Sequence, residues 1–286
     1  KVSNSQEMLE ALDQQDLTSA DYYFQKALVE DSDDLLLELA YYLEGIGFYP
    51  QARQIYEKLA PVFPEVNLNL ASISSEDGQI EEAFAYLEEI QPNSDSYVSA
   101  LVLKADFYQM EGLTDVAREK LLEALHYSDD PLLTFGLAEL DSELGNDLEA
   151  IKGYAQLDNR DIYEQTGIST YQRIGTAYAR LGKFESAIEF LEKALELEYE
   201  DQTAFELASL YFDQEEYQKA VLYFKQLDTI SPDFEGYEYG YSQALHKEHQ
   251  TEQALLVAQQ GLEKNPFETR LLLLASQLSY ELHQPE

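Results

Sequence analysis

Hydrophobic residues recur along this chain in two short stripes separated by a break, and the whole motif returns about every 34 residues. Each stripe has the spacing of one face of an α-helix. Self-similarity at such a period is typical of a solenoid, in which each unit buries its apolar face only by stacking on its neighbours. The period is marked most clearly by an alanine, found at Ala20, Ala52, Ala83, Ala117, Ala150, Ala187, Ala220 and Ala254.

The unit at 168–200 shows the motif best. Its first stripe includes Tyr171, Ile174, Gly175 and Tyr178, at the i, i+3, i+4, i+7 spacing of a helix. After a break at 181–183, a second stripe predicts a second helix through Phe184, Ala187, Leu191 and Ala194. The small residues Gly175 and Ala187 are expected to let the two helix backbones approach closely.

This pattern resembles the tetratricopeptide repeat, and the resemblance covers nearly the whole chain. It implies an all-α fold: a right-handed superhelical solenoid of about eight helix-turn-helix repeats plus a C-terminal capping helix, forming one domain over 1–286. The family's frequent tryptophan is absent. We expect repeats at approximately 1–32, 33–63, 64–97, 98–130, 131–167, 168–200, 201–234 and 235–268, and the capping helix at 269–283.

The two ends differ from the middle. The tenth position of each repeat should face the preceding repeat, and it is apolar from Tyr42 onward but Glu10 in the first repeat. A polar outer face is what a terminal repeat needs. The other apolar tenth-position residues are Ile73, Phe107, Leu140, Ala177, Leu210 and Ala244. At the other end, one helix is expected to pack back onto the eighth repeat through Leu271, Leu274, Leu278 and Leu282. On this basis the array is expected to be complete.

One step is longer than the period: Ala150 and Ala187 are separated by about three extra residues, which fall within 158–167. An insertion there is either a hinge between two half-arrays or a tolerated surface loop. Since extending a loop costs little free energy, the loop is the favoured interpretation.

Charge narrows the choice of partner. The chain carries 56 acidic and 18 basic residues, for a formal net charge of −38. Nucleic-acid binding requires a basic footprint, so that class is disfavoured, as are anionic membrane surfaces. No apolar run approaches the length of a membrane span, and we expect a cytoplasmic protein. The acidity either steers a basic partner towards the chain or selects no partner at all; both interpretations stay open.

Candidate chemistry is sparse. The chain has no cysteine and four histidines, of which His246 and His249 share a helical face without forming a recognised metal-ligand set. Phosphate-binding loops, nucleophile elbows and the HExxH motif are absent. We therefore expect no enzyme activity, no metal and no cofactor.

In the tetratricopeptide family, positions 2, 5, 9 and 12 of each first helix line a concave groove. No lysine occupies position 5 or 9 here, which argues against the family's clamp for C-terminal carboxylates. Apolar residues at position 5 can equally serve only to support the scaffold. The residues predicted to bind a peptide on the concave face are Tyr41, Val102, Asp106, Gln109, Phe135, Glu139, Gln172, Thr176, Phe205, Ser209, Phe212 and Tyr239.

The favoured function is therefore a non-catalytic protein–protein interaction module, such as an adaptor, scaffold or assembly factor. It would bind a peptide segment that is basic and carries hydrophobic anchors. A regulatory receptor for a short signalling peptide is the first alternative. A mainly structural or oligomeric scaffold is the second.

Overall fold

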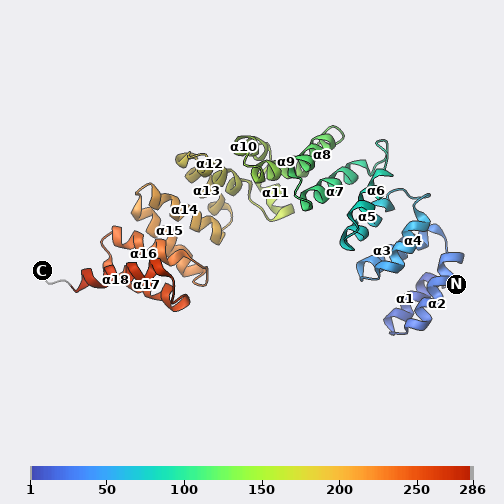
Figure 1. The fold of residues 1–286 in the computed structure, drawn as a ribbon, viewed down its shortest axis with the longest axis horizontal. Helices are drawn as coiled ribbons and strands as arrows, with labels where there is room; N and C mark the ends of the chain where they lie inside the picture. Colours follow the sequence, from blue (N-terminus) through green and yellow to red (C-terminus); the bar gives the residue numbers. More distant parts are fainter. Residues whose placement is uncertain (1, 284–286) are drawn as a thin grey trace. The chain divides into compact units, whose positions relative to one another are not determined.

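The computed structural model describes residues 2–283, which form eighteen α-helices and no strand (Figure 1). By internal packing the chain divides into two compact units, the first ending at Leu133 and the second beginning at Thr134. The division falls near the start of α9, which begins at Pro131. Among the described residues, no helix has the length and apolar character required to cross a membrane.

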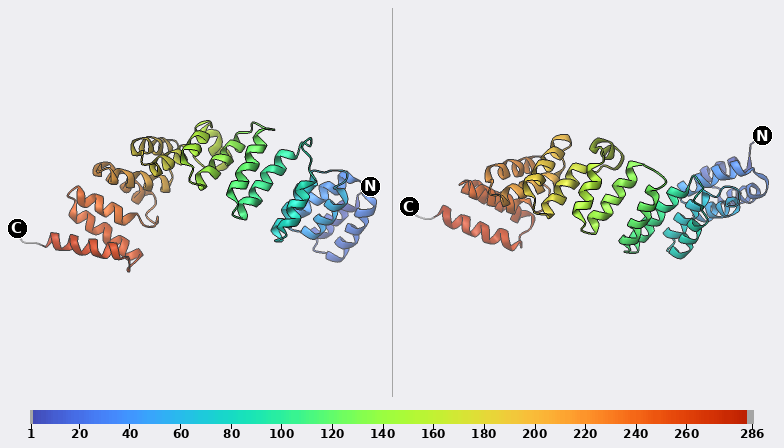
Figure 2. Two further views of the ribbon diagram at one scale, coloured as in Figure 1. Left: turned by 45° about the horizontal axis from the view of Figure 1, so that its top comes forward. Right: turned by 90° about the horizontal axis from the view of Figure 1, so that it is seen from above.

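The first unit consists of four helix pairs. The colours in Figure 2 follow the residue numbers, so consecutive helices can be traced along the chain. Their bounds are α1 (Asn4–Asp13), α2 (Leu17–Glu30), α3 (Asp33–Gly45), α4 (Tyr49–Leu59), α5 (Val66–Glu76), α6 (Ile80–Glu88), α7 (Tyr97–Met110) and α8 (Thr114–Leu125).

The second unit adds four more pairs and two single helices. The single helices are α11, inserted between two pairs, and α18 after the last pair. The bounds are α9 (Pro131–Glu143), α10 (Asp147–Ala155), α11 (Asn159–Thr166), α12 (Thr170–Arg180), α13 (Phe184–Leu197), α14 (Asp201–Asp213), α15 (Tyr217–Ile230), α16 (Tyr237–Lys247), α17 (Thr251–Lys264) and α18 (Thr269–Leu282).

The two small positions of the clearest repeat act as predicted. A Cβ atom built on Gly175 of α12 would lie 2.7 Å from Cγ of Leu191 and 3.1 Å from the carbonyl oxygen of Ala187, both on α13. Real Cβ atoms essentially never come as close as 2.7 Å to another heavy atom, and a separation of 3.1 Å is tighter than most real contacts. Glycine at this position therefore sets the distance between the two helices of the pair.

The core follows the predicted stripes with exceptions, one of which is Phe184 on α13, a residue of the predicted second stripe that is 37% exposed. Among the tenth-position residues predicted to face the preceding repeat, Tyr42 differs from the others because it is 52% exposed. The prediction was therefore wrong for Tyr42. A tyrosine can keep its hydroxyl in water at such a place. On α18, Leu271, Leu274 and Leu278 are buried as expected, alongside Ile73, Phe107, Leu140, Ala177, Leu210 and Ala244.

The extra residues after α10 form a helix rather than the favoured loop. Asp158 begins α11 by accepting a hydrogen bond from the Asp161 amide at 3.0 Å, and Gly167 ends it with φ of +73°. Ile162 on α11 is buried and packs in the same core cluster as Ile174 of α12. The insertion therefore contributes to the core of the second unit.

A side-chain hydrogen-bond cluster joins the two helices of the first pair. The carboxylate of Asp31, just after α2, accepts bonds from the Ser5 amide at 2.8 Å and the Ser5 hydroxyl at 2.5 Å, and from Asn4 Nδ2 at 3.1 Å. Partial burial acts in the opposite direction, but these hydrogen bonds hold the pKa of the Asp31 carboxyl below its ordinary value.

Replacing Asp31 by asparagine should therefore lower the free energy of unfolding by about 1 kcal/mol at neutral pH. A carboxyl whose pKa is depressed by folding stabilises the protein above its ordinary pKa, and this contribution is lost as the pH falls through the lower folded value. Urea unfolding of wild type and Asp31→Asn at about pH 7 and about pH 3 measures the difference. An equal difference at both pH values would contradict this assignment.

Candidate peptide-binding face

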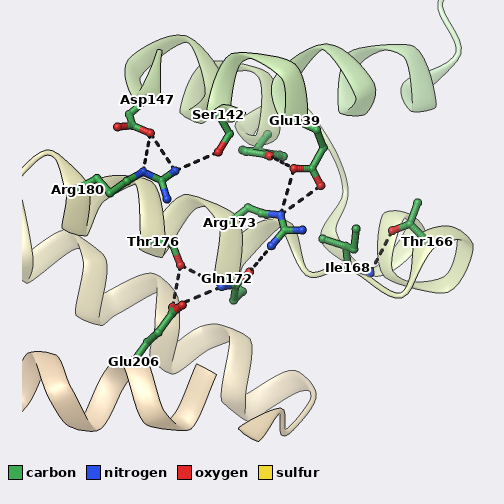
Figure 3. A network of polar contacts seen from close by, with 11 residues as sticks. Glu139, Ser142, Asp147, Thr166, Ile168, Gln172, Arg173, Thr176, Arg180 and Glu206 are labelled. Carbon is green, nitrogen blue, oxygen red and sulfur yellow. Dashed lines mark hydrogen bonds and ion pairs between the residues drawn. The ribbon is translucent and has the colours of Figure 1, made fainter. Parts of the chain in front are cut away.

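The first helices of three successive pairs in the second unit share one polar network (Figure 3). Arg173 Nε on α12 donates to both carboxylate oxygens of Glu139 on α9, each at 3.2 Å. Thr176 Oγ1 donates to Glu206 Oε2 on α14 at 2.8 Å, and Gln172 Nε2 lies 3.0 Å from Thr176 Oγ1. The predicted residues Glu139, Gln172 and Thr176 are thus brought together across neighbouring helices.

Helical spacing places these side chains on one face. Gln172 and Thr176 are one turn apart on α12, so their side chains lie one above the other. The Arg173 Nη1 atom donates to Gln172 Oε1 at 3.2 Å, which joins the Glu139 pair to the Thr176–Glu206 bond. The network is half-buried, so its charges are partly shielded from solvent.

The carboxylate of Glu139 also accepts a hydrogen bond from the second helix of its own pair. The hydroxyl of Tyr154, a buried residue of α10, donates to Glu139 Oε2 at 2.6 Å. Burial and this bond raise the pKa of Tyr154 far above its ordinary value, so the hydroxyl stays a donor. Glu139 is thereby fixed in orientation with its charge paired to Arg173.

Glu206 differs from Glu139 because its hydrogen-bond donors are neutral. It accepts from Thr176 at 2.8 Å, from Gln172 at 3.4 Å and from Gln202 at 3.5 Å, and no ion pair of the described residues includes it. The network therefore holds two carboxylates and one guanidinium. Its excess charge is negative and lies at the α14 end.

The predicted aromatic residues are only partly accessible. Phe205 on α14 is half-buried, with its ring centroid 5.6 Å from that of Phe234, and Phe212 lies 5.3 Å from Tyr217. Tyr239 on α16 lies under the guanidinium of Arg270 at 4.4 Å. These rings keep exposed surface, as does half-buried Ser209 on α14, while also supporting the core.

Phe135 is different. Only 8% of it is exposed, and its ring packs 6.1 Å from that of Tyr154 in the core of the second unit. The structure thus corrects the prediction that Phe135 contacts a ligand, because its surface is already covered by α10. Its place at position 5 is explained by support of the scaffold.

In the first unit the predicted residues lie on two helices. Tyr41 on α3 is 46% exposed. Val102, Asp106 and Gln109 follow one another on α7 at intervals of four and three residues, which places them along one face. Asp106 is exposed, yet partial desolvation by its surroundings raises the pKa of its carboxyl. Val102, Asp106 and Gln109 thus share one face of α7, whereas Tyr41 lies on a different helix.

The sequence reasoning missed Arg173, Glu206 and Tyr154. A signal for two of them was present, because Arg173 follows Glu139 by 34 residues and Glu206 follows Gln172 by 34 residues. In a repeat array, residues one period apart lie on neighbouring equivalent helices. Complementary side chains at that separation indicate a contact. No group of three or more metal-ligating side chains occurs among residues 2–283.

Comparison with known proteins agrees with the helix pairs. Residues 109–162 match a family model described as YpiA-like tetratricopeptide repeats, and residues 168–201 and 202–234 match the general tetratricopeptide-repeat model. A curated relative, the TPR repeat-containing protein YpiA of Bacillus subtilis (strain 168), is 26% identical over 262 residues. The match covers 90% of this chain and 61% of the relative, so the chain spans about three fifths of that protein's length.

Solved structures with the same fold are more distant in sequence. The C-terminal part of a TPR repeat-containing protein from Cytophaga hutchinsonii superposes with a TM-score of 0.66 at 15% identity, covering 83% of this chain and 98% of the other. The MamA protein gives a TM-score of 0.52 at 17% identity, covering 68% and 100%. These similarities confirm the predicted all-α tetratricopeptide solenoid, and at such identities they concern the fold alone.

Proposed function

We propose that this chain, a tetratricopeptide-repeat protein, is a non-catalytic interaction module whose second unit binds a basic peptide segment with hydrophobic anchors. The binding surface, here called the leading-helix face, consists of the exposed parts of α12, α14 and α16 together with Glu139 of α9. Among the predicted residues, it includes Gln172, Thr176, Phe205, Ser209, Phe212 and Tyr239.

The observation that carries this proposal is the polar network beside partly exposed aromatic rings. Glu206 presents a carboxylate with only neutral donors, and it neighbours Phe205 on the same helix. A cationic side chain would gain a charge-assisted hydrogen bond at such a carboxylate. Apolar side chains of the same peptide would cover the exposed edges of the rings.

The charge of the whole chain supports the same class of partner. A net charge of −38 attracts basic segments over several ångströms and raises their association rate. This long-range contribution is screened by salt, whereas burial of apolar anchors is not. A basic peptide with anchors should therefore lose affinity, but not all of it, as the salt concentration rises.

A library of fluorescent 15-residue peptides, measured by anisotropy at low and high salt, tests the proposal. Basic peptides with two or more large apolar residues should bind, and the double variant Glu139→Gln/Glu206→Gln should weaken them about tenfold. The matched control, Glu189→Gln/Glu196→Gln, removes the same charge from exposed positions of α13 and should change affinity less than twofold. Binding that is equally sensitive to both double variants would contradict the proposed face.

A further inference from the structure

The first unit contains a separate cavity of about 320 Å³ formed by α3, α4 and α5. We call it the α3–α5 pocket. It combines two tyrosines and two carboxylates with the small residues Gly45 and Ser72. One of the tyrosines is Tyr41, which was predicted to bind a peptide. Its lining residues are Tyr41, Glu44, Gly45, Tyr49, Ser72, Ile73 and Glu76.

One carboxylate of the pocket is fixed by the protein. Glu44 Oε1 accepts a hydrogen bond from the Tyr56 hydroxyl at 2.6 Å and another from Asn69 Nδ2 at 2.9 Å. Tyr56 is completely buried, so water does not compete with Glu44 for its hydroxyl group. Both bonds fall on Oε1, and no bond within the described residues uses Oε2. The second oxygen thus remains available to a ligand.

The aromatic walls are open to solvent. Tyr41 is 46% exposed and Tyr49 is 38% exposed, unlike the tyrosines of the core. The Tyr41 ring is braced by Tyr56, with centroids 6.0 Å apart. Aromatic faces attract cations, and arginine in particular stacks on them.

The lining of this pocket, as the described residues form it, contains no lysine, arginine or histidine. None of the ion pairs among the described residues includes Glu44 or Glu76. Arg53, which is near in sequence, is engaged by Asp77 at 3.4 Å and Glu82 at 3.2 Å. The pocket therefore combines negative charge, exposed aromatic faces and space for a side chain.

We propose that the α3–α5 pocket receives an arginine side chain of a basic peptide segment, stacked on Tyr41 or Tyr49 and paired with Glu44 Oε2. This inference rests on the proposed function, the recognition of basic segments, and assigns to the first unit an arginine contact of its own that is separate from the leading-helix face. A guanidinium suits the pocket better than an ammonium because it is planar, less strongly hydrated and able to donate to a carboxylate while stacking.

Titration of the full chain with acetyl-arginine-amide, followed by NMR of labelled tyrosine, tests the pocket directly. Saturable shifts are expected at Tyr41 and Tyr49, with a dissociation constant on the order of 10 mM. Acetyl-citrulline-amide, which has the same shape without the charge, should bind at least fivefold more weakly. Ionic strength is kept equal with sodium chloride, because salt screens surface charge.

Two variants separate the pocket from general acidity. Glu44→Gln keeps an oxygen to accept from Tyr56 and Asn69 but removes the charge, and it should abolish the saturable shifts. Glu38→Gln removes the same charge from an exposed position of the same helix and should leave them in place. Shifts that persist in Glu44→Gln, or that are absent from Tyr41 and Tyr49 in the wild type, would overturn the proposal.

The peptide library distinguishes failure of the pocket from failure of the proposed function. In a peptide that binds, changing the critical arginine to citrulline should weaken binding about tenfold in the wild type and about twofold or less in Glu44→Gln. If no arginine-containing peptide that binds the chain shows this coupling, the pocket alone is refuted and binding at the leading-helix face stands. If acetyl-arginine-amide binds at Tyr41 and no library peptide binds, the pocket stands and the peptide-binding function is refuted.

Discussion

Leucine in place of Gly175 is expected to lower the free energy of unfolding of the second unit by about 3 kcal/mol. The new side chain would begin at a Cβ atom 2.7 Å from Leu191 Cγ and 2.9 Å from Leu191 Cδ2. Leu191 is completely buried in the core of the second unit. The helices α12 and α13 would have to separate, and the core between them would lose contacts. Urea unfolding monitored by circular dichroism measures the loss.

Gly45→Ala is the matched control for Gly175→Leu. Gly45 is also a helical glycine, the last residue of α3, but a Cβ atom built on it meets nothing within 4 Å. Alanine there should raise the free energy of unfolding by about 0.5 kcal/mol, because it restricts the unfolded chain and favours the helix. Equal destabilisation by both substitutions would show that close packing at Gly175 is not the cause.

Methionine in place of Lys264 is expected to lower the free energy of unfolding by about 3 kcal/mol. The Lys264 ammonium, on α17, contacts the carboxylate of Glu238 and the carbonyl oxygen of Pro232. The Glu238 side chain on α16 is only 4% exposed. Removing the lysine leaves a buried carboxylate without its counter-charge, which is far more unfavourable than losing an exposed ion pair.

The double variant Glu238→Gln/Lys264→Met tests this explanation. Because it removes both charges, it should recover at least half of the stability lost by Lys264→Met. Arg160→Met provides the comparison at an exposed ion pair, where the Arg160 side chain is 86% exposed and Glu164 is 64% exposed. That change should alter the free energy of unfolding by less than about 0.5 kcal/mol. No recovery in the double variant would show that lost packing, not charge, dominates.

The sequence contained enough to predict the helix pairs and their core. The period alone placed the repeats, since a unit that cannot bury its apolar stripe by itself must stack on its neighbours. Gly175 and Ala187 indicated close contact of two helices, and Leu271, Leu274 and Leu278 indicated the packing of α18. These features depend on local spacing, which a single sequence displays.

The prediction of a surface loop at 158–167 was wrong, because only a few residues distinguish a short helix from a loop of the same length. Asp158 as a capping residue, buried Ile162 and Gly167 in the left-handed region together specify α11. Capping residues and one apolar anchor were visible in the sequence, but no apolar stripe was. A helix held by its caps and a single apolar residue has no periodic stripe that a sequence pattern could show.

The candidate site was the hardest part to predict. Position within the repeat does not separate Phe135, which is covered by the core, from Phe205, which keeps exposed surface. That difference depends on how neighbouring side chains pack. The charge pairing of Arg173 with Glu139 was visible only as a separation of one period.

Paramagnetic relaxation enhancement shows which helices of the chain lie next to a bound peptide. A basic peptide selected from the library, carrying a nitroxide at its centre, is added to the isotope-labelled chain. Binding at the leading-helix face predicts that amide signals of α12 and α14, including Gln172, Thr176 and Ser209, broaden strongly. Signals of the second helices, such as Glu189 on α13 and Lys225 on α15, should change little. Broadening concentrated on α13 and α15 instead would contradict the proposed binding face.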